Sequence, residues 1–290
     1  MFQEPPSHVG LVVADLDAAL EGLAALGPFA VTEPRPFHAR SAGGGESARV
    51  AGLRAAWASW SGLRIELLEG IPGSVWEPRA RPYLHHLGFW VDAVDEASER
   101  LAAAGLALEI AGGDGSGGPI RFAYHAFGGF RLEVSGTGRG AEVDALMSAA
   151  GARDPAGLGS PSHLAAVVPD LRAARSALAG LAELPWLTLG PVEDLPLLRL
   201  GNDPQPRPGQ SGWKSWTTLG SLDLELLEPG GPVLDPRPEP YLHHVGYAVP
   251  DLAVASAALV RLGLPVELTL WTESGEPERV AYHNLEGFRI

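Results

Sequence analysis

The chain has 290 residues, a formal net charge of −14, no cysteine, and a single lysine, Lys214, among its 21 basic residues. This charge argues against a nucleic-acid or anionic-membrane partner and favours a small molecule, while the lack of cysteine leaves histidine and carboxylates as the strong metal ligands. The N-terminal MFQEPPSH does not have the pattern of a signal segment, and no apolar run approaches the ~18 residues of a membrane span, so we expect a soluble, cytoplasmic protein.

The first predicted unit consists of a strand, a helix and further strands. A strand begins at His8, and Asp15 can cap a following helix of regularly spaced leucines that ends at Gly27. Residues 28–52 are rich in Pro and Gly, and the stretch AGGGES at 42–47 reads as a loop or lid. Apolar runs then indicate a hairpin, in which Glu66 lies on the opposite face of the pleat from its apolar neighbours.

The same unit follows a second time. Its first strand is YLHHLGFWV, Tyr83–Val91, in which the paired histidines stand before an apolar run, and Glu133 takes the place that Glu66 has in the first unit. The helix is expected over 94–104, and the three strands are expected near 106–110, 120–127 and 130–134. Each unit therefore has the order βαβββ, opens with His and closes with Glu.

The second half of the chain repeats this plan. YLHHLGFWV returns as YLHHVGYAV, 158 residues later, and His163, Glu225 and His244 repeat three of the four recurring residues. In this register the counterpart of Glu133 would be residue 291, one past Ile290, so we expect a second site with weaker metal binding.

A repeat of this length predicts two domains. Residues 136–160 are rich in Gly, Ala and Pro, with a short helix expected over 142–150. We therefore expect a first domain at 1–137, a linker with a short helix at 138–159, and a second domain at 160–290.

The recurring residues suggest a metal site. His8, Glu66, His86 and Glu133 can meet only if the two units form one curved cup with these positions facing inward. Two imidazoles and two carboxylates suit a divalent ion such as Mn, Fe, Co, Ni or Zn. Taken singly, each residue is more easily read as a surface histidine or a solvated glutamate, and it is the recurrence at matched places that favours ligands.

Four segments of the sequence resemble a known superfamily. HVGLVVADL, IELLEGIPGSVW, HHLGFWVD and FAYHAFGGFRLEV are similar to the vicinal oxygen chelate superfamily, which includes glyoxalase I, methylmalonyl-CoA epimerase, extradiol dioxygenases and fosfomycin-resistance proteins. The epimerase and glyoxalase branch is the most similar. The resemblance implies an α+β fold of two tandem domains, each with two βαβββ modules in a curved mixed-sheet cup. It also implies that His8, Glu66, His86 and Glu133 are the metal ligands.

The resemblance implies a metal-dependent isomerase, epimerase or lyase that abstracts a proton next to a chelated carbonyl, with Glu133 or Glu66 as the catalytic base. One alternative is an extradiol-type Fe(II) dioxygenase, a branch that is similar in Tyr124 but uses only one carboxylate ligand. The other is a non-catalytic, drug-sequestering protein. The candidate substrate-pocket residues are Tyr124, His125, Trp57 and Trp60.

Two further questions stay open at this level. His85 and His243 either orient the histidines that follow them or are ordinary strand-start residues. The assembly is either a monomer with two pseudo-dimeric domains or a homodimer.

Overall fold

The computed structural model describes most of the chain. The described residues are 6–24, 27–41, 48–60, 62–114, 119–127, 130–151, 157–179, 185–190, 197–200, 212–230, 234–238, 240–271, 280–285 and 288–290. Residues 42–47, which are the predicted loop or lid, and residues 152–156, within the predicted linker, lie outside this set.

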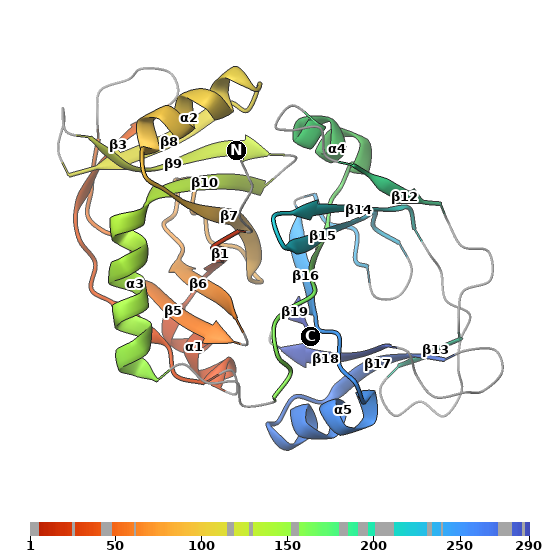
Figure 1. Cartoon of the computed structure of the whole chain (residues 1–290). Coiled ribbons are helices and arrows are strands. Elements are labelled where there is room, and N and C mark those ends of the chain that lie inside the picture. The colour runs from red at the N-terminus through yellow and green to blue at the C-terminus, as the bar shows by residue number, and fades with distance from the viewer. Residues whose placement is uncertain are drawn as a thin grey trace.

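The first half forms one curved mixed sheet, drawn in red to light green in Figure 1. Its strands are β1 (His8–Val13), β2 (Ala30–Thr32), β3 (Phe37–Ser41), β4 (Ala48–Val50), β5 (Ala55–Trp60), β6 (Leu63–Glu69), β7 (Tyr83–Val91), β8 (Leu108–Gly113), β9 (Ile120–Phe127) and β10 (Phe130–Gly136). They lie in the order β2-β5-β6-β1-β7-β10-β9-β8-β3-β4. At the centre, β1 runs antiparallel to β7, and each of the two has a parallel outer neighbour, β6 beside β1 and β10 beside β7.

Two βαβββ modules make up most of this sheet, as the sequence predicts. The first runs β1-α1-β2-β5-β6 and the second β7-α2-β8-β9-β10, with α1 at Leu16–Gly22 and α2 at Val94–Ala103. The Asp15 side chain caps α1 by accepting a hydrogen bond from the backbone N–H of Ala18 at 3.0 Å. The helix ends at Gly22, before the predicted Gly27.

The region 28–52 includes short strands that the sequence analysis did not identify. It contains β2, β3 and β4. β2 pairs with β5 inside the first module, whereas β3 crosses to the far end of the sheet and pairs with β8. Alternation is hard to recognise in strands this short, which explains why the sequence pattern did not reveal them.

The second half repeats the architecture. Its strands are β11 (His163–Val167), β12 (Leu187–Leu189), β13 (Leu197–Leu200), β14 (Lys214–Leu219), β15 (Leu222–Leu227), β16 (Tyr241–Gly246), β17 (Val266–Trp271), β18 (Val280–Leu285) and β19 (Phe288–Arg289), with helices α4 (Leu171–Ala179) and α5 (Leu252–Arg261). The strand order, β12-β14-β15-β11-β16-β19-β18-β17-β13, matches that of the first sheet from β2 to β3, and among the described residues β4 has no counterpart.

The helix in the predicted linker is longer than expected. α3 covers Thr137–Ala150, so it begins five residues before the predicted start at Glu142. It packs on β10, β2, β5 and β7 of the first sheet, along which Figure 1 shows it in light green. Arg64 on β6 anchors it through an ion pair of 2.8 Å with Asp144. The division into domains stays a prediction, but α3 is packed with the first half.

The two faces of the first sheet differ in chemistry. One face is apolar, and its side chains join α1, α2 and apolar residues of the second half in a single buried cluster that includes Val9, Leu11, Leu67, Leu101 and Leu164. The opposite, concave face carries His8, Glu66 and His86. The main core therefore lies behind the sheet, and the polar group lies in front of it. Among the described residues, no helix is both long and apolar enough to cross a membrane.

Candidate metal centre

The two central strands bring the two histidines of the first half face to face. In the β1–β7 ladder His8 lies opposite Gly88, and His86 lies opposite Gly10. A Cβ atom at Gly88 would be 1.9 Å from Cε1 of His8, and one at Gly10 would be 1.9 Å from Cε1 of His86. Each imidazole therefore lies over a glycine, and the missing side chain leaves room for the ring in this position.

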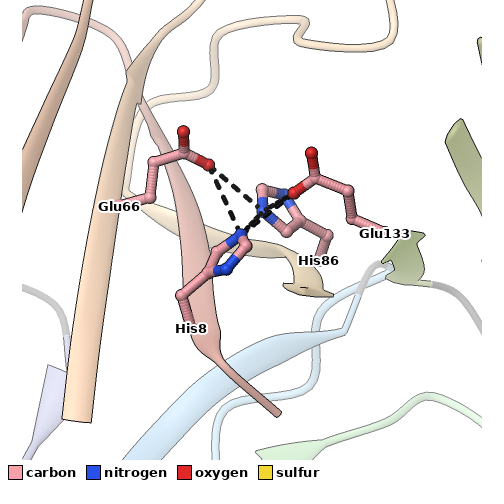
Figure 2. A group of neighbouring side chains, drawn as sticks. All are labelled: His8, Glu66, His86 and Glu133. Carbon is pink, nitrogen blue, oxygen red and sulfur yellow. Dashed lines mark hydrogen bonds and ion pairs between the residues drawn. The ribbon is translucent and has the colours of Figure 1, made fainter. Parts of the chain in front are cut away.

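Glu66 from β6 and Glu133 from β10 complete the group (Figure 2). Nε2 of His8 is 3.0 Å from Nε2 of His86, and Oε2 of Glu133 lies 2.9 Å from both nitrogens. Oε2 of Glu66 is 3.2 Å from Nε2 of His86 and 3.9 Å from Nε2 of His8. All four side chains are buried. The structure thus brings together the four residues that the sequence singled out.

Hydrogen bonds behind the histidines determine which ring nitrogen carries the proton. The Ser7 hydroxyl donates to the Gly88 carbonyl at 2.9 Å, so the contact of 3.0 Å between its oxygen and Nδ1 of His8 is one in which Nδ1–H donates. Nε2 of His8 then presents a lone pair to the group when the ring is neutral. A proton on Nδ1 and a bare Nε2 is the form that metal-ligating histidines adopt.

A different relay fixes His86. Nε2–H of His85 donates to the Val75 carbonyl at 3.1 Å, and Nδ1 of His85 lies 3.0 Å from Nδ1 of His86. Burial, reinforced by the neighbouring His86, lowers the pKa of His85 well below its usual value, so His85 is neutral and its Nδ1 accepts from Nδ1–H of His86. Nε2 of His86 therefore points at the group. Of the two interpretations of His85, the orienting one agrees with this contact.

A β-bulge makes this relay possible. Gly10 pairs with His86 while Leu11 pairs with Leu84, which leaves His85 as the extra residue in β7. Adjacent strand residues normally face opposite sides of the sheet, but the bulge lets both rings lie on the concave side. The same shift occurs at Ala165/Ala166 in the second half.

His86 and Glu133 of the group shift each other's pKa values. Burial lowers the pKa of His86, but the charge of Glu133 and the hydrogen bonds to both carboxylates outweigh burial and raise this pKa to about 9. Burial in turn raises the pKa of Glu133, but the two histidines overcome this effect and hold the pKa well below its usual value. The group thus stabilises a positive charge at the place where the histidine nitrogens and the carboxylate oxygens meet.

The donor set fits a divalent ion. Metal–ligand bonds of about 2.1 Å place neighbouring ligand atoms roughly 3 Å apart, which is close to most of the separations found here. Two imidazole nitrogens and two carboxylates are hard-to-borderline ligands that suit first-row divalent metals. A divalent ion would also balance the two buried carboxylate charges.

Two polar neighbours of the group were not found from the sequence. Nη2 of Arg139, on α3, lies 3.3 Å from Oε1 of Glu66, and the Ser135 hydroxyl donates to Oε1 of Glu133 at 2.6 Å. Arg139 comes from the predicted linker, and nothing in its local sequence indicates that α3 folds back. Ser7 was also missed, although a serine precedes the first histidine in both halves, at Ser7 and Ser162.

Two of the four candidate pocket residues border the group. The Tyr124 ring is 5.1 Å from the His86 ring, and Tyr124 pairs with Glu133 across the β9–β10 ladder. The Trp57 ring is 5.0 Å from the His8 ring. Both side chains are nearly inaccessible to solvent. They form walls of the group, and their contact with a substrate stays a prediction.

The other two candidates lie on the opposite face of the sheet. Nε2 of His125 is 2.8 Å from the Ser98 hydroxyl of α2, and its Nδ1–H donates to the Leu106 carbonyl at 3.0 Å. Trp60 belongs to the main core and contacts Tyr247 of the second half, with ring centroids 6.2 Å apart. These placements correct the pocket assignment of both residues, because the strand pleat directs them away from Tyr124 and Trp57.

The second half contains a matching group of His163, Glu225 and His244. Nε2 of His163 lies 2.9 Å from Nε2 of His244, and Oε2 of Glu225 lies 3.5 Å from Nε2 of His244. Ser162 and His243 contact the Nδ1 atoms of the two histidines at 3.0 and 2.8 Å, so the orienting contacts are repeated as well.

Comparison with known proteins supports the superfamily assignment. The sequence profile of the Glyoxalase/Bleomycin resistance protein/Dioxygenase superfamily matches residues 7–124, which is most of the first half. Residues 7–124 thus match the vicinal oxygen chelate superfamily, and the second half of the chain repeats the same fold. A search of curated protein sequences gave no match.

Solved structures support the fold of the whole chain. A triple mutant of 4-hydroxymandelate synthase from Streptomyces coelicolor is similar with a TM-score of 0.53 and 16% identity, over 90% of this chain and 76% of that chain. A xylose isomerase-like TIM barrel/4-hydroxyphenylpyruvate dioxygenase fusion protein is similar with a TM-score of 0.54 and 15% identity, over 91% of this chain and 40% of the fusion protein. At these identities the likeness concerns the fold alone.

The Ser7 contact leads to a first prediction. Ser7→Ala removes the acceptor that fixes the His8 tautomer, so we expect metal affinity to fall about 10-fold, the lower end of such effects. Isothermal titration with Zn²⁺ or Mn²⁺ measures this change. Ser162→Ala is the matched control, since it removes the same hydroxyl from the second half. An unchanged affinity in Ser7→Ala would show that Ser7 does not orient His8.

Proposed function

We propose that the chain is a metal-dependent isomerase, epimerase or lyase, which abstracts a proton next to a carbonyl of a small molecule with two neighbouring oxygens. The observation that supports it most is that two buried carboxylates face one histidine pair and that the contacts around them fix one carboxylate more firmly than the other. One carboxylate can then hold the metal while the other moves a proton.

The geometry distinguishes the two carboxylates. Both oxygens of Glu133 are fixed, Oε2 by the two Nε2 atoms at 2.9 Å and Oε1 by Ser135 at 2.6 Å. Glu66 is closer to one histidine than to the other, at 3.2 and 3.9 Å. We therefore assign Glu133 as a permanent ligand and Oε2 of Glu66 as the base that takes the proton.

The surroundings fit such a role. A divalent ion held here would stabilise negative charge that develops on two neighbouring substrate oxygens. Arg139 contacts Oε1 of Glu66, the oxygen that does not face the histidines. The side chain of Arg139 is 38% exposed, while that of Glu66 is 3% exposed. Arg139 thus lies between the buried group and solvent, where it can orient both Glu66 and an incoming oxygen anion. Trp57 and Tyr124 exclude water from the sides.

Solvent deuterium exchange tests this proposal. Metal-loaded protein is expected to exchange the acidic proton of an α-hydroxy-carbonyl or acyl-thioester substrate, and the metal-free protein is not. Glu66→Gln should retain metal but slow exchange by at least about 100-fold, the usual contribution of a general base. Glu133→Gln should lose the metal itself. Wild-type exchange rates in Glu66→Gln would exclude Glu66 as the base, and no exchange across a broad panel would count against the reaction class.

A dioxygenase is the second candidate, favoured by Tyr124. Its ring lies beside both His86 and Glu133, and burial, with the charge of Glu133, raises its pKa well above the usual value, so the hydroxyl keeps its proton. The superfamily description also names dioxygenases. Oxygen consumption by the Fe(II)-loaded protein with catechols would support this candidate. Tight ligand binding without turnover, retained when the four residues are replaced, would instead support a sequestering protein.

A further inference from the structure

The group in the second half differs from the first in its charge. In the first half Glu66 and Glu133 both face the histidine pair, and Arg139 contacts Glu66. In the second half, among the described residues, Glu225 faces the pair and Lys214 contacts Glu225. The carboxylates exceed the adjacent cation by one negative charge in the first group, whereas the two charges cancel in the second.

Lys214 has the position that Arg139 has in the first half. Its Nζ lies 3.6 Å from Oε1 of Glu225, while Oε2 of the same carboxylate faces His244 at 3.5 Å. Nζ also lies over the Trp216 ring at 5.9 Å, as the Arg139 guanidinium lies over Trp57 at 5.9 Å. The two cations come from different elements, Lys214 from β14 and Arg139 from α3. Each half thus has a cation at the outer oxygen of its glutamate.

The histidine pair of the second half is otherwise suited to a metal. Ser162 donates to the Gly246 carbonyl at 3.0 Å and so accepts from Nδ1–H of His163, which leaves Nε2 of His163 directed at the group. Glu225 and His244 are each about 5% exposed or less. The ammonium of Lys214 is a compact cationic group 3.6 Å from a largely buried carboxylate, where it repels a second cation at the same carboxylate.

We propose that Lys214 is a built-in counter-cation, which keeps the affinity of the His163, Glu225 and His244 group for divalent metal far below that of the first group. Removing the charge of Lys214 unmasks a second metal site. In this account the wild-type protein binds one ion tightly per chain, and the second histidine pair is available for a metal only when Lys214 is neutralised or displaced.

The experiment is a metal titration of the whole chain with Zn²⁺ alone. Wild-type protein is expected to bind one ion per chain tightly, and Lys214→Met is expected to bind a second with affinity at least about 10-fold higher than any weak second event in the wild type. Adding His244→Ala to Lys214→Met should remove the second ion and keep the first. This double variant shows that the new ion is at the proposed group.

Two variants serve as controls. Lys214→Arg keeps the charge at the same place and should bind one ion, like the wild type. Arg175→Met removes one positive charge from α4 of the same half, where the guanidinium lies over Trp186 at 5.6 Å, and should also bind one. Two ions of equal affinity in the wild type would overturn the proposal. So would a Lys214→Met protein that is folded by circular dichroism and binds no second ion.

Discussion

Replacing His86 with alanine is expected to abolish tight divalent-metal binding at the first group, with a fall in affinity of at least about 100-fold. Nε2 of His86 lies within 3.2 Å of His8 and both carboxylates, so its loss removes the atom that all three other members contact. His8→Ala should have a similar effect. Metal content after dialysis, measured per chain, gives the result directly.

The fold should survive these substitutions. The four residues lie on the concave face, whereas the main core lies on the other side of the sheet, so metal loss and unfolding can be separated. His244→Ala, the same change at the corresponding place in the second half, should leave the first ion bound. Stoichiometric metal in both His86→Ala and His8→Ala would refute the assignment.

Gly88→Ala is expected to disrupt the centre although it changes no ligand. The added methyl carbon would be 1.9 Å from Cε1 of His8, far below van der Waals contact, so the ring must leave its position over β7. Gly246 has the same relation to His163, at 1.9 Å. We expect tight metal binding to be lost and the melting temperature to fall by several degrees, as overpacking of a buried site costs roughly 1–3 kcal/mol.

Substitutions at two other glycines serve as comparisons for Gly88→Ala. Gly138→Ala on α3 places its methyl group where no atom lies within 4 Å, so it should leave metal binding unchanged. Gly10→Ala should reduce metal binding less than Gly88→Ala does. In the second half Ala165 occupies the place that corresponds to Gly10, opposite His244, and the Nε2 atoms of His163 and His244 are still only 2.9 Å apart. Unchanged metal affinity in Gly88→Ala would show that the ring position of His8 is not critical.

The repeat pattern of the sequence predicted the modules and the four-residue group. His8, Glu66, His86 and Glu133 recur at matched places in matched units, and because such units pair through their first strands, the matched residues converge. That inference depends on periodicity and order, which a single sequence displays. That all four bind a metal remains a prediction for the experiments above.

Side-chain direction and long-range packing were harder to predict. Trp60 lies three residues from Trp57, and His125 follows Tyr124, so the pleat turns each pair to opposite faces. The sequence analysis grouped them by residue type instead. The bulge at His85 breaks this alternation, and no local sequence signal reveals it. Arg139 reaches Glu66 only because α3 folds back on the first sheet, a tertiary contact that helix propensity does not encode.

Anomalous diffraction from crystals of the wild-type protein grown with Mn²⁺ or Zn²⁺ tests the central claim most directly. We expect one strong peak in the first half, about 2.0–2.3 Å from Nε2 of His8, Nε2 of His86 and at least one oxygen of Glu133. A protein that is saturated with metal in solution, yet shows its anomalous peak away from these residues, would contradict the account.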